Sequence, residues 1–216
     1  MKNIVLYAPP VAGKGTQCEL LVKNYGYEVI SIGQVLRNAR NPETEIGRII
    51  IETQDKGILT PDDIVAKALK EELSKYENKS IVVEGYPRNI DQAKLLDTIL
   101  DNYIVINLEI NRDIAKNRTL GRVSCEQCNK IYNIYFPETR PRDEGICDEC
   151  GGKLKRRSDD NEESFNVRFD VYEENAPAII DFYQKKGILY KVNSGISKEY
   201  TSEQVDRILN EGTIND

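Results

Sequence analysis

The pattern of apolar and polar positions alternates between short β-rich runs and longer helical stretches. The apolar runs cover residues 4–7, 27–30, 80–83, 103–108 and 188–192. Helical patterns lie between them, over residues 15–24, 61–76, 89–100, 112–120, 161–186 and 201–211. Strands that alternate with helices predict an α/β fold, with a parallel sheet of five strands covered by helices on both faces. Such sheets bind ligands beyond the carboxyl ends of their strands.

Two stretches break this alternation. Residues 31–60 have a helical pattern without a strand, and glycines punctuate them. Residues 123–160 are rich in Cys, Gly, Pro and charge, with short β-like pieces around 131–136. We expect both stretches to be insertions between elements of the core.

The segment between the first predicted strand and the first predicted helix is typical of a phosphate-binding loop. It reads Ala8-Pro9-Pro10-Val11-Ala12-Gly13-Lys14-Gly15-Thr16. Such a loop points backbone N–H groups at an anion, and the start of the helix adds a favourable dipole. Lys14 is placed to reach the β- and γ-phosphates, and Thr16 offers a hydroxyl near the metal. Ala8 stands where the usual pattern has glycine, so the alternative is an ordinary loop that leads into a helix.

The composition of the chain limits the reactions and partners that it can have. The chain has 216 residues, 39% of them hydrophobic, a net charge of −6 and no histidine. Histidine-based acid–base catalysis and histidine metal ligands are therefore excluded, whereas phosphoryl transfer needs mainly positioning and cations. The acidic balance argues against nucleic acid as a partner. The chain has no apolar run of about 20 residues and no signal-peptide pattern, so we expect no membrane span and a cytoplasmic location.

Four of the five cysteines form two knuckles, Cys125-x-x-Cys128 and Cys147-x-x-Cys150. Two such pairs can place four thiolates around one tetrahedral ion, which predicts a structural zinc site. The alternatives are two disulfides, which a cytoplasmic chain disfavours, or thiols without a ligand. Cys18 lies outside the cluster, and we expect it to be a buried helix residue.

Further motifs, taken in order along nearly the whole chain, resemble the adenylate kinase family in its long form with a zinc-bearing lid. They are Pro10 with Gly13-Lys14-Gly15-Thr16-Gln17, Ser31-Ile32-Gly33-Gln34 with Arg37, Asp55-Lys56-Gly57-Ile58-Leu59-Thr60-Pro61-Asp62, Glu84-Gly85-Tyr86-Pro87-Arg88 with Gln92, Arg118 with Gly121-Arg122, and Arg157 to Glu163 with Arg168.

The resemblance implies a P-loop nucleoside monophosphate kinase fold. Residues 1–30, 61–122 and 161–216 would form the core, residues 31–60 the monophosphate-binding domain, and residues 123–160 the lid. The implied reaction is reversible phosphoryl transfer from Mg-ATP to AMP, which gives two ADP. Lid closure would complete the site and exclude water. The family is usually monomeric, so we expect a monomer.

The resemblance also implies roles for individual residues. The implied catalytic residues are Lys14, Arg88, Arg122, Arg157 and Arg168. ATP would contact Val11, Ala12, Gly13, Lys14, Gly15, Thr16, Arg118, Arg122, Ile131 and Tyr132. AMP would contact Ile32, Arg37, Ile58, Leu59, Thr60, Gly85, Tyr86, Pro87, Arg88, Gln92, Arg157 and Arg168. Asp159 and Asp160 would orient the lid or its arginines rather than act as bases.

The chain departs from the family pattern near the site. Ala8 and Val11 replace glycines, and a valine there is strained if the backbone requires a positive φ. Ile32 replaces a threonine. Gln34 and Glu84 replace aspartates that help to order hydrated magnesium in the family. Val123 stands where a second arginine often follows Gly-Arg.

These departures leave several functions open. The first is an active kinase with a reduced rate or another monophosphate acceptor. The second is a nucleotide-binding sensor or scaffold with little catalysis. A third, a zinc-ribbon binder of nucleic acid, is disfavoured by the negative charge. The retained lysine and arginines favour catalysis, because a protein that only binds nucleotide would need fewer of them.

Overall fold

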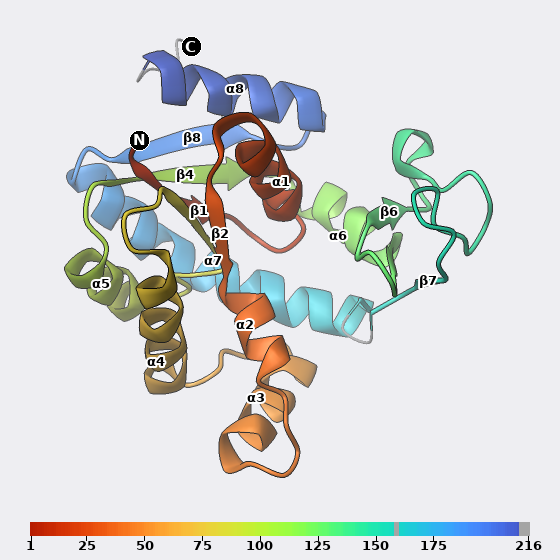
Figure 1. The fold of residues 1–216 in the computed structure, drawn as a ribbon, viewed down its shortest axis with the longest axis horizontal. Helices are drawn as coiled ribbons and strands as arrows, with labels where there is room; N and C mark the ends of the chain where they lie inside the picture. Colours follow the sequence, from red (N-terminus) through yellow and green to blue (C-terminus); the bar gives the residue numbers. More distant parts are fainter. Residues whose placement is uncertain (158–159, 212–216) are drawn as a thin grey trace.

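The computed structural model describes residues 1–157 and 160–211. Its centre is a parallel sheet of five strands in the order β2-β3-β1-β4-β8 (Figure 1). The strands are β1 (Asn3–Tyr7), β2 (Glu28–Ser31), β3 (Ile81–Glu84), β4 (Tyr103–Glu109) and β8 (Leu189–Asn193). The predicted fold class is confirmed.

The sheet is buried on both faces because its strands are continuous apolar runs. Successive side chains of a strand point to opposite faces. In β1, Ile4 and Leu6 pack into one apolar cluster, whereas Val5 and Tyr7 pack into the other. Each face therefore needs its own layer of helices.

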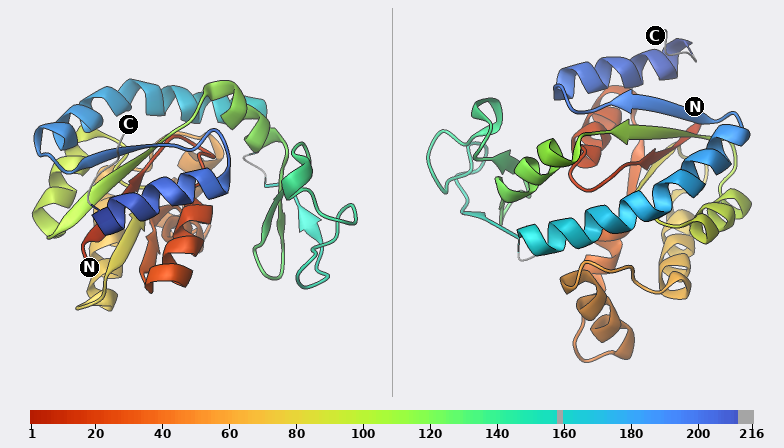
Figure 2. Two further views of the ribbon diagram at one scale, coloured as in Figure 1. Left: turned by 90° about the horizontal axis from the view of Figure 1, so that it is seen from above. Right: turned by 180° about the vertical axis from the view of Figure 1, so that it is seen from behind.

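The helices form these two layers, which Figure 2 shows from two further directions. On one face lie α1 (Lys14–Tyr25) and α8 (Lys198–Glu211), which contribute Cys18, Leu21, Val205 and Ile208 to the core. The helices α4 (Asp62–Leu73), α5 (Ile90–Ile99) and α7 (Glu162–Lys185) cover the other face. As predicted, Cys18 is a buried helix residue.

The first insertion consists of α2 (Ile32–Asn38) and α3 (Glu45–Asp55), which project from the sheet in Figure 1. The side chain of Thr44 accepts a hydrogen bond from the N–H of Gly47 and caps α3. Ile50 of α3 is buried in the cluster that also contains Leu36 of α2. The insertion is thereby anchored to the core.

The second insertion is a separate antiparallel sheet in the order β6-β5-β7, which follows α6 (Arg112–Leu120). Its strands are β5 (Arg122–Cys125), β6 (Ile131–Asn133) and β7 (Leu154–Lys155), and the short helix η2 (Pro137–Thr139) follows β6. Its buried apolar cluster holds Cys125, Tyr132, Cys147 and Leu154, with Val123 packed against it. This cluster is small for a folding unit, so the insertion needs another source of stability.

Several element boundaries differ from the sequence predictions. The helix expected over 61–76 ends at Leu73 and continues as the 3₁₀ turn η1 (Ser74–Tyr76). The last helix begins at Lys198 rather than 201, because Ser197 bonds to the N–H of Tyr200 and forms the first turn. Within the described ranges, no helix is both long enough and apolar enough to cross a membrane.

Candidate active site

A cleft of about 580 Å³ opens where β1 and β3 end, between the core and the two insertions. Most of the residues predicted to bind nucleotide line it. They are Val11, Ala12, Gly13, Lys14, Gly15, Thr16, Arg37, Leu59, Gly85, Tyr86, Pro87, Arg88, Arg118, Arg122, Ile131, Tyr132, Arg157 and Arg168. The fold therefore gathers residues from distant parts of the chain around one cavity.

The loop after β1 has two residues with positive φ. Gly13, at φ 92°, forms the N-cap of α1, and Val11 has φ 60°. Valine is a rare residue in this left-handed region because its branched Cβ crowds the backbone. The condition for strain that the sequence left open is therefore met at Val11.

Lys14 folds back over this loop. Its Nζ donates hydrogen bonds to the carbonyl oxygens of Ala8, at 3.1 Å, and Pro9, at 2.9 Å. Burial lowers the pKa of Lys14 to about 8, although the nearby Glu84 opposes the shift. A lysine desolvated in this way gains a strong partner when an anionic phosphate enters.

Two arginines approach the cleft from the first insertion and from the loop after β3. The Nε of Arg88 donates to the carbonyl of Gly85 at 3.0 Å. Burial, together with the nearby charges of Arg168 and Arg37, lowers the pKa of Arg88 to about 10, although Glu84 opposes the shift. Gln34 accepts from both Nε and Nη2 of Arg37, at 3.1 and 2.9 Å. Several cations thus share a desolvated space, which favours a multiply charged anion.

An ion pair between Arg122 and Asp160 lies where the second insertion joins the core. Arg122 donates from Nε to Asp160 Oδ2 at 2.8 Å, and its Nη2 bonds to the other carboxylate oxygen. The Asp160 side chain is 0% exposed and that of Arg122 is 11% exposed. This geometry orients Arg122, as expected of Asp160, whereas Asp159 lies outside the described residues. Nearby, burial lowers the pKa of Arg118, which also lines the cleft.

Glu84, at the end of β3, lies in the cleft between the loop and the first insertion. Its carboxylate accepts a hydrogen bond from the hydroxyl of Ser31. The Glu84 carboxylate therefore lies in the cleft beside the loop, on a longer side chain than that of an aspartate.

Four predicted AMP-binding residues do not line the cleft. Ile32 is 1% exposed and packs in the main apolar cluster, whereas Ile58 is 46% exposed. Thr60 is buried, with its hydroxyl 3.0 Å from that of Thr53. Gln92 is bonded to protein groups on both ends of its amide. Their roles at a nucleotide remain predictions.

The sequence analysis missed several residues of the cleft wall, and two parts of it show why. The loop between β8 and α8 lines the cleft with Gly195, Ile196 and Ser197. Ile196 is 63% exposed, which the sequence does not show, so no residue pattern marked this loop. Tyr172 of α7 also lines the cleft, and its ring centroid lies 5.5 Å from that of Tyr7. A helical pattern does not reveal which turn of a helix meets a cavity.

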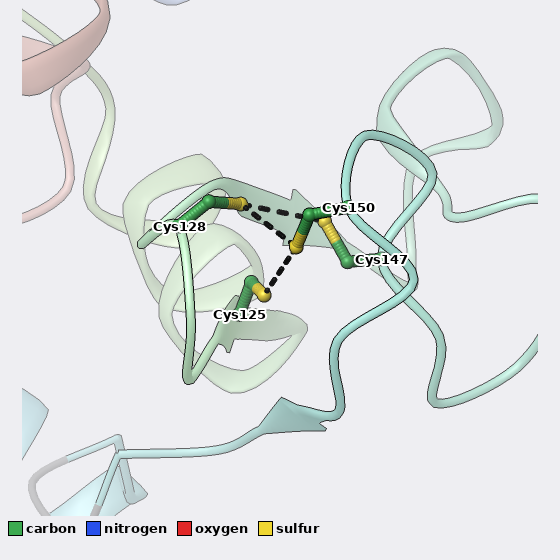
Figure 3. Close-up of side chains that lie close together, drawn as sticks. All are labelled: Cys125, Cys128, Cys147 and Cys150. Atoms are coloured by element: carbon green, nitrogen blue, oxygen red, sulfur yellow. Dashed lines mark hydrogen bonds between the residues drawn. The ribbon is translucent and has the colours of Figure 1, made fainter.

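The four predicted metal ligands lie together in the second insertion (Figure 3). Their sulfur atoms all lie within 4.8 Å of one another. The Sγ of Cys125 lies 3.4 Å from that of Cys150, and the Cys128–Cys147 separation is 3.5 Å. Four thiolates around a tetrahedral ion with metal–sulfur bonds of about 2.3 Å would be about 3.8 Å apart. The cluster therefore fits a metal ion after a small expansion.

Neighbouring groups support the cysteine cluster. The hydroxyl of Tyr132 accepts the N–H of Asp148 at 2.8 Å and lies 3.5 Å from Cys147 Sγ. A Cβ on Gly152 would lie 2.9 Å from Cys125 Sγ, so only glycine leaves room for the sulfur. Tyr132 thus joins the cysteine cluster to the cleft that it also lines.

Comparison with known proteins gives a consistent match. A family model described as "Adenylate kinase" matches residues 6–188. An adenylate kinase of Archaeoglobus fulgidus is 37% identical over 214 residues, which cover 96% of this chain and 97% of that protein. One of Bacillus subtilis is 39% identical over 197 residues, 88% of this chain and 90% of the relative. One of Caldanaerobacter subterraneus is 36% identical, with 96% of each chain covered.

Proposed function

This chain belongs to the adenylate kinase family, and we propose how its cleft carries out the reaction. The reaction is reversible phosphoryl transfer from ATP to AMP, giving two ADP. The observation that carries the proposal is the convergence of Lys14, Arg37, Arg88, Arg122 and Arg168 on a single cleft. Phosphoryl transfer spreads negative charge over the moving group, so such an array stabilises the transition state.

The donor nucleotide would lie between the phosphate loop and the second insertion. Residues 11–16 would hold its phosphates, with Lys14 exchanging its carbonyl partners for phosphate oxygens. Arg118 and Arg122 would contact the donor, and Ile131 and Tyr132 would lie over its base. Ile196, which also lines the cleft, would offer a second apolar surface for that base.

The acceptor would lie between the first insertion and α7. Arg37 and Arg88 would fix its phosphate, because guanidinium groups match phosphate with two parallel hydrogen bonds. Residues 58–60 and 85–87 would frame its adenosine, with Ile32 behind them and Gln92 at the base. Arg157 and Arg168 would contact the phosphates from the other side.

Closure of the second insertion would complete the site. Arg122 and Arg157 lie at the two ends of this insertion, so its movement would carry both guanidinium groups toward the phosphates. Water would then be excluded as a competing acceptor. AMP already presents an ionised phosphate oxygen, so the reaction needs no general base.

Magnesium would accompany ATP. The donor groups here fit a hydrated ion, since Thr16 supplies a hydroxyl and Glu84 a carboxylate within the same cleft. Bound magnesium neutralises phosphate charge and orients the phosphates. Gln34 has an amide in place of a carboxylate, and its oxygen already accepts hydrogen bonds from Arg37, so Glu84 would supply the carboxylate near the hydrated ion.

The metal at the four cysteines is proposed to be zinc, because a set of four thiolates is typical of structural zinc sites. Four protein ligands leave no open position, so its role would be to stabilise the lid. Metal analysis of the purified protein should find one zinc per chain, and a stable protein without metal would contradict this assignment. A reducing compartment would keep the thiols available, which supports a cytoplasmic location.

The proposed division of the chain follows the same logic. Residues 1–30, 61–122 and 161–216 would act as the core, residues 31–60 as the monophosphate-binding domain and residues 123–160 as the lid. Each expected substrate site is built within one chain, which supports a monomer. Light scattering on the purified protein tests this.

A coupled assay tests the function directly. Mg-ATP should be turned over with AMP, and more slowly with CMP, UMP or GMP. Lys14→Ala should lower kcat/KM by several orders of magnitude while circular dichroism and the unfolding transition stay close to those of the wild type. Unchanged turnover in that variant would remove the loop from the mechanism.

A nucleotide sensor is the second candidate, and the observation that favours it is the left-handed conformation of Val11 in the phosphate loop. A protein of this kind would bind ATP and AMP in calorimetry without turnover for any acceptor. Turnover with another monophosphate but not with AMP would keep the mechanism and change the substrate.

A further inference from the structure

The small sheet of the second insertion has two different faces. In the ladder between β5 and β6, Arg122 is paired with Asn133, and Val123 is paired with Tyr132. Directly paired residues share a face of the sheet, and successive residues alternate between its faces. Arg122, Asn133 and Ile131 therefore lie on one face, and all three line the cleft. Tyr132 belongs to the other face, where it is 7% exposed and packs with two of the cysteines.

The hydroxyl of Tyr132 joins this second face to the second cysteine knuckle. It lies 3.5 Å from Cys147 Sγ and accepts the N–H of Asp148 at 2.8 Å. A metal-bound cysteine is a thiolate, which accepts hydrogen bonds and donates none. With metal bound, the one hydrogen of the hydroxyl is therefore directed to the sulfur, and hydrogen bonds to charged groups are the stronger ones. Both contacts follow the position that the metal gives to the knuckle.

These contacts connect parts of the sheet that are not neighbours in its ladder. The strand order is β6-β5-β7, so β5 separates β6 from β7, the strand that follows the second knuckle. β6 has three residues and lies at the edge of this sheet, with Tyr132 at its centre. The Tyr132 hydroxyl therefore anchors a short edge strand to the metal-bearing knuckle.

An anchor on β6 also acts on the donor side of the cleft. Ile131 and Asn133 flank Tyr132 in β6 and line the cleft. The Nδ2 of Asn133 donates to the carbonyl oxygen of Arg118 at 2.8 Å, and Arg118 lines the cleft as well. A displacement of β6 would thus reach residues proposed to contact ATP. The proposed acceptor site, by contrast, lies between the first insertion and α7.

We propose that Tyr132 is a positioning residue, whose hydroxyl couples the metal at the four cysteines to the affinity of the donor side for ATP. This inference rests on the proposed function, in which β6 meets the donor base. The bound metal fixes the second knuckle, the knuckle fixes the Tyr132 hydroxyl, and the hydroxyl fixes the strand. Coupling between two sites typically changes affinity fivefold or more, and it acts equally in both directions.

The experiment measures calorimetric Kd values for ATP and for AMP, with the metal-loaded protein and with protein stripped by a chelator under reducing conditions. In the wild type, stripping should raise the Kd for ATP about fivefold or more and should change the Kd for AMP less than about twofold. Tyr132→Phe keeps the ring and removes the hydroxyl. Metal-loaded Tyr132→Phe should bind ATP about as weakly as the stripped wild type, and stripping it should add less than about twofold.

The matched control is Tyr135→Phe, which removes the hydroxyl of a lid tyrosine that is 49% exposed. Its metal dependence should equal that of the wild type. An equal rise of the ATP Kd in stripped Tyr132→Phe and stripped wild type would mean that the metal acts on the lid as a whole, and it overturns the inference. An ATP affinity of the wild type that does not depend on the metal also overturns it.

Cobalt(II) in place of the native metal gives a second measurement, which decides the matter if the stripped lid does not stay folded. Bonds between cobalt and thiolates absorb light, so the absorption reports on the cysteine cluster itself. ATP should shift this absorption in the wild type and in Tyr135→Phe, whereas AMP should not. An equal shift with ATP in Tyr132→Phe overturns the inference. A wild type that does not turn over Mg-ATP with AMP would instead refute the proposed function.

Discussion

Replacing Val11 by glycine tests whether the phosphate loop is strained. Val11 has φ 60°, a conformation that a β-branched residue adopts at a cost of roughly 1–3 kcal/mol. Glycine adopts it without that cost. The same change makes the unfolded chain more flexible, which opposes the gain by about 0.4–1 kcal/mol. We therefore expect Val11→Gly to raise the free energy of unfolding by about 1 kcal/mol.

The assay is urea unfolding of the wild type and the variant. The midpoint should rise with an unchanged slope, and the thermal midpoint should rise by roughly 2–4 °C for a chain of this size. Val11→Ala is the control, since it removes the branch but keeps a Cβ in the left-handed region. Its gain should be smaller than that of Val11→Gly.

The Val11→Gly variant also tests how the loop binds the donor phosphates. Without the valine side chain, the backbone N–H groups should approach the donor phosphates more closely, so kcat/KM for Mg-ATP should rise. A loss of both stability and activity would refute the reasoning. It would show that the loop has adapted to the valine, because the packing of the Val11 side chain would then stabilise the protein more than the left-handed backbone conformation destabilises it.

Three further outcomes are expected. Because burial lowers the pKa of Lys14 to about 8, the side chain is fully charged below pH 7 and loses its charge as the pH rises above 8. The value of kcat/KM for Mg-ATP should therefore fall about tenfold per pH unit above pH 8, and a flat profile up to pH 9.5 would contradict this. Asp160→Ala leaves the buried charge of Arg122 without its partner and should lower the free energy of unfolding, measured in urea, by about 3 kcal/mol. The control Asp170→Ala, at the exposed pair with Arg112, should lower it by less than about 1 kcal/mol. Cys147→Ser should lower metal content and the melting temperature of the lid, while Cys18→Ser, outside the cluster, should leave the metal content unchanged.

The central sheet was predictable because its information is local. Each strand is a short apolar run rich in β-branched residues, and each is followed by a helical pattern. The phosphate loop and the cysteine knuckles were predictable for the same reason, since each motif lies within a few consecutive residues. The gathering of the four cysteines also followed from their spacing.

The remaining features depend on pairing across long distances. The strands β5 and β7 have four and two residues, too few for a periodic pattern, and their register is set by contact with each other. The bond between Asp62 and Gln92 joins two helix starts 30 residues apart, which only the packed layers bring together. The positive φ of Val11 runs against the preference of valine, so no residue-level rule would predict it.

The two arginines at the ends of the second insertion have an evolutionary consequence. Arg122 is the first residue of β5 and Arg157 follows β7, so both lie where the second insertion joins the core, and the metal-bearing tip lies between them. The tip has its own sheet and its own small apolar cluster. It can therefore be exchanged as a module, for a version held together by other side chains or for a longer one, as long as the new version keeps an apolar surface where Ile131 and Tyr132 line the cleft. Substitutions that tune heat tolerance can accumulate there while the reaction centre stays the same.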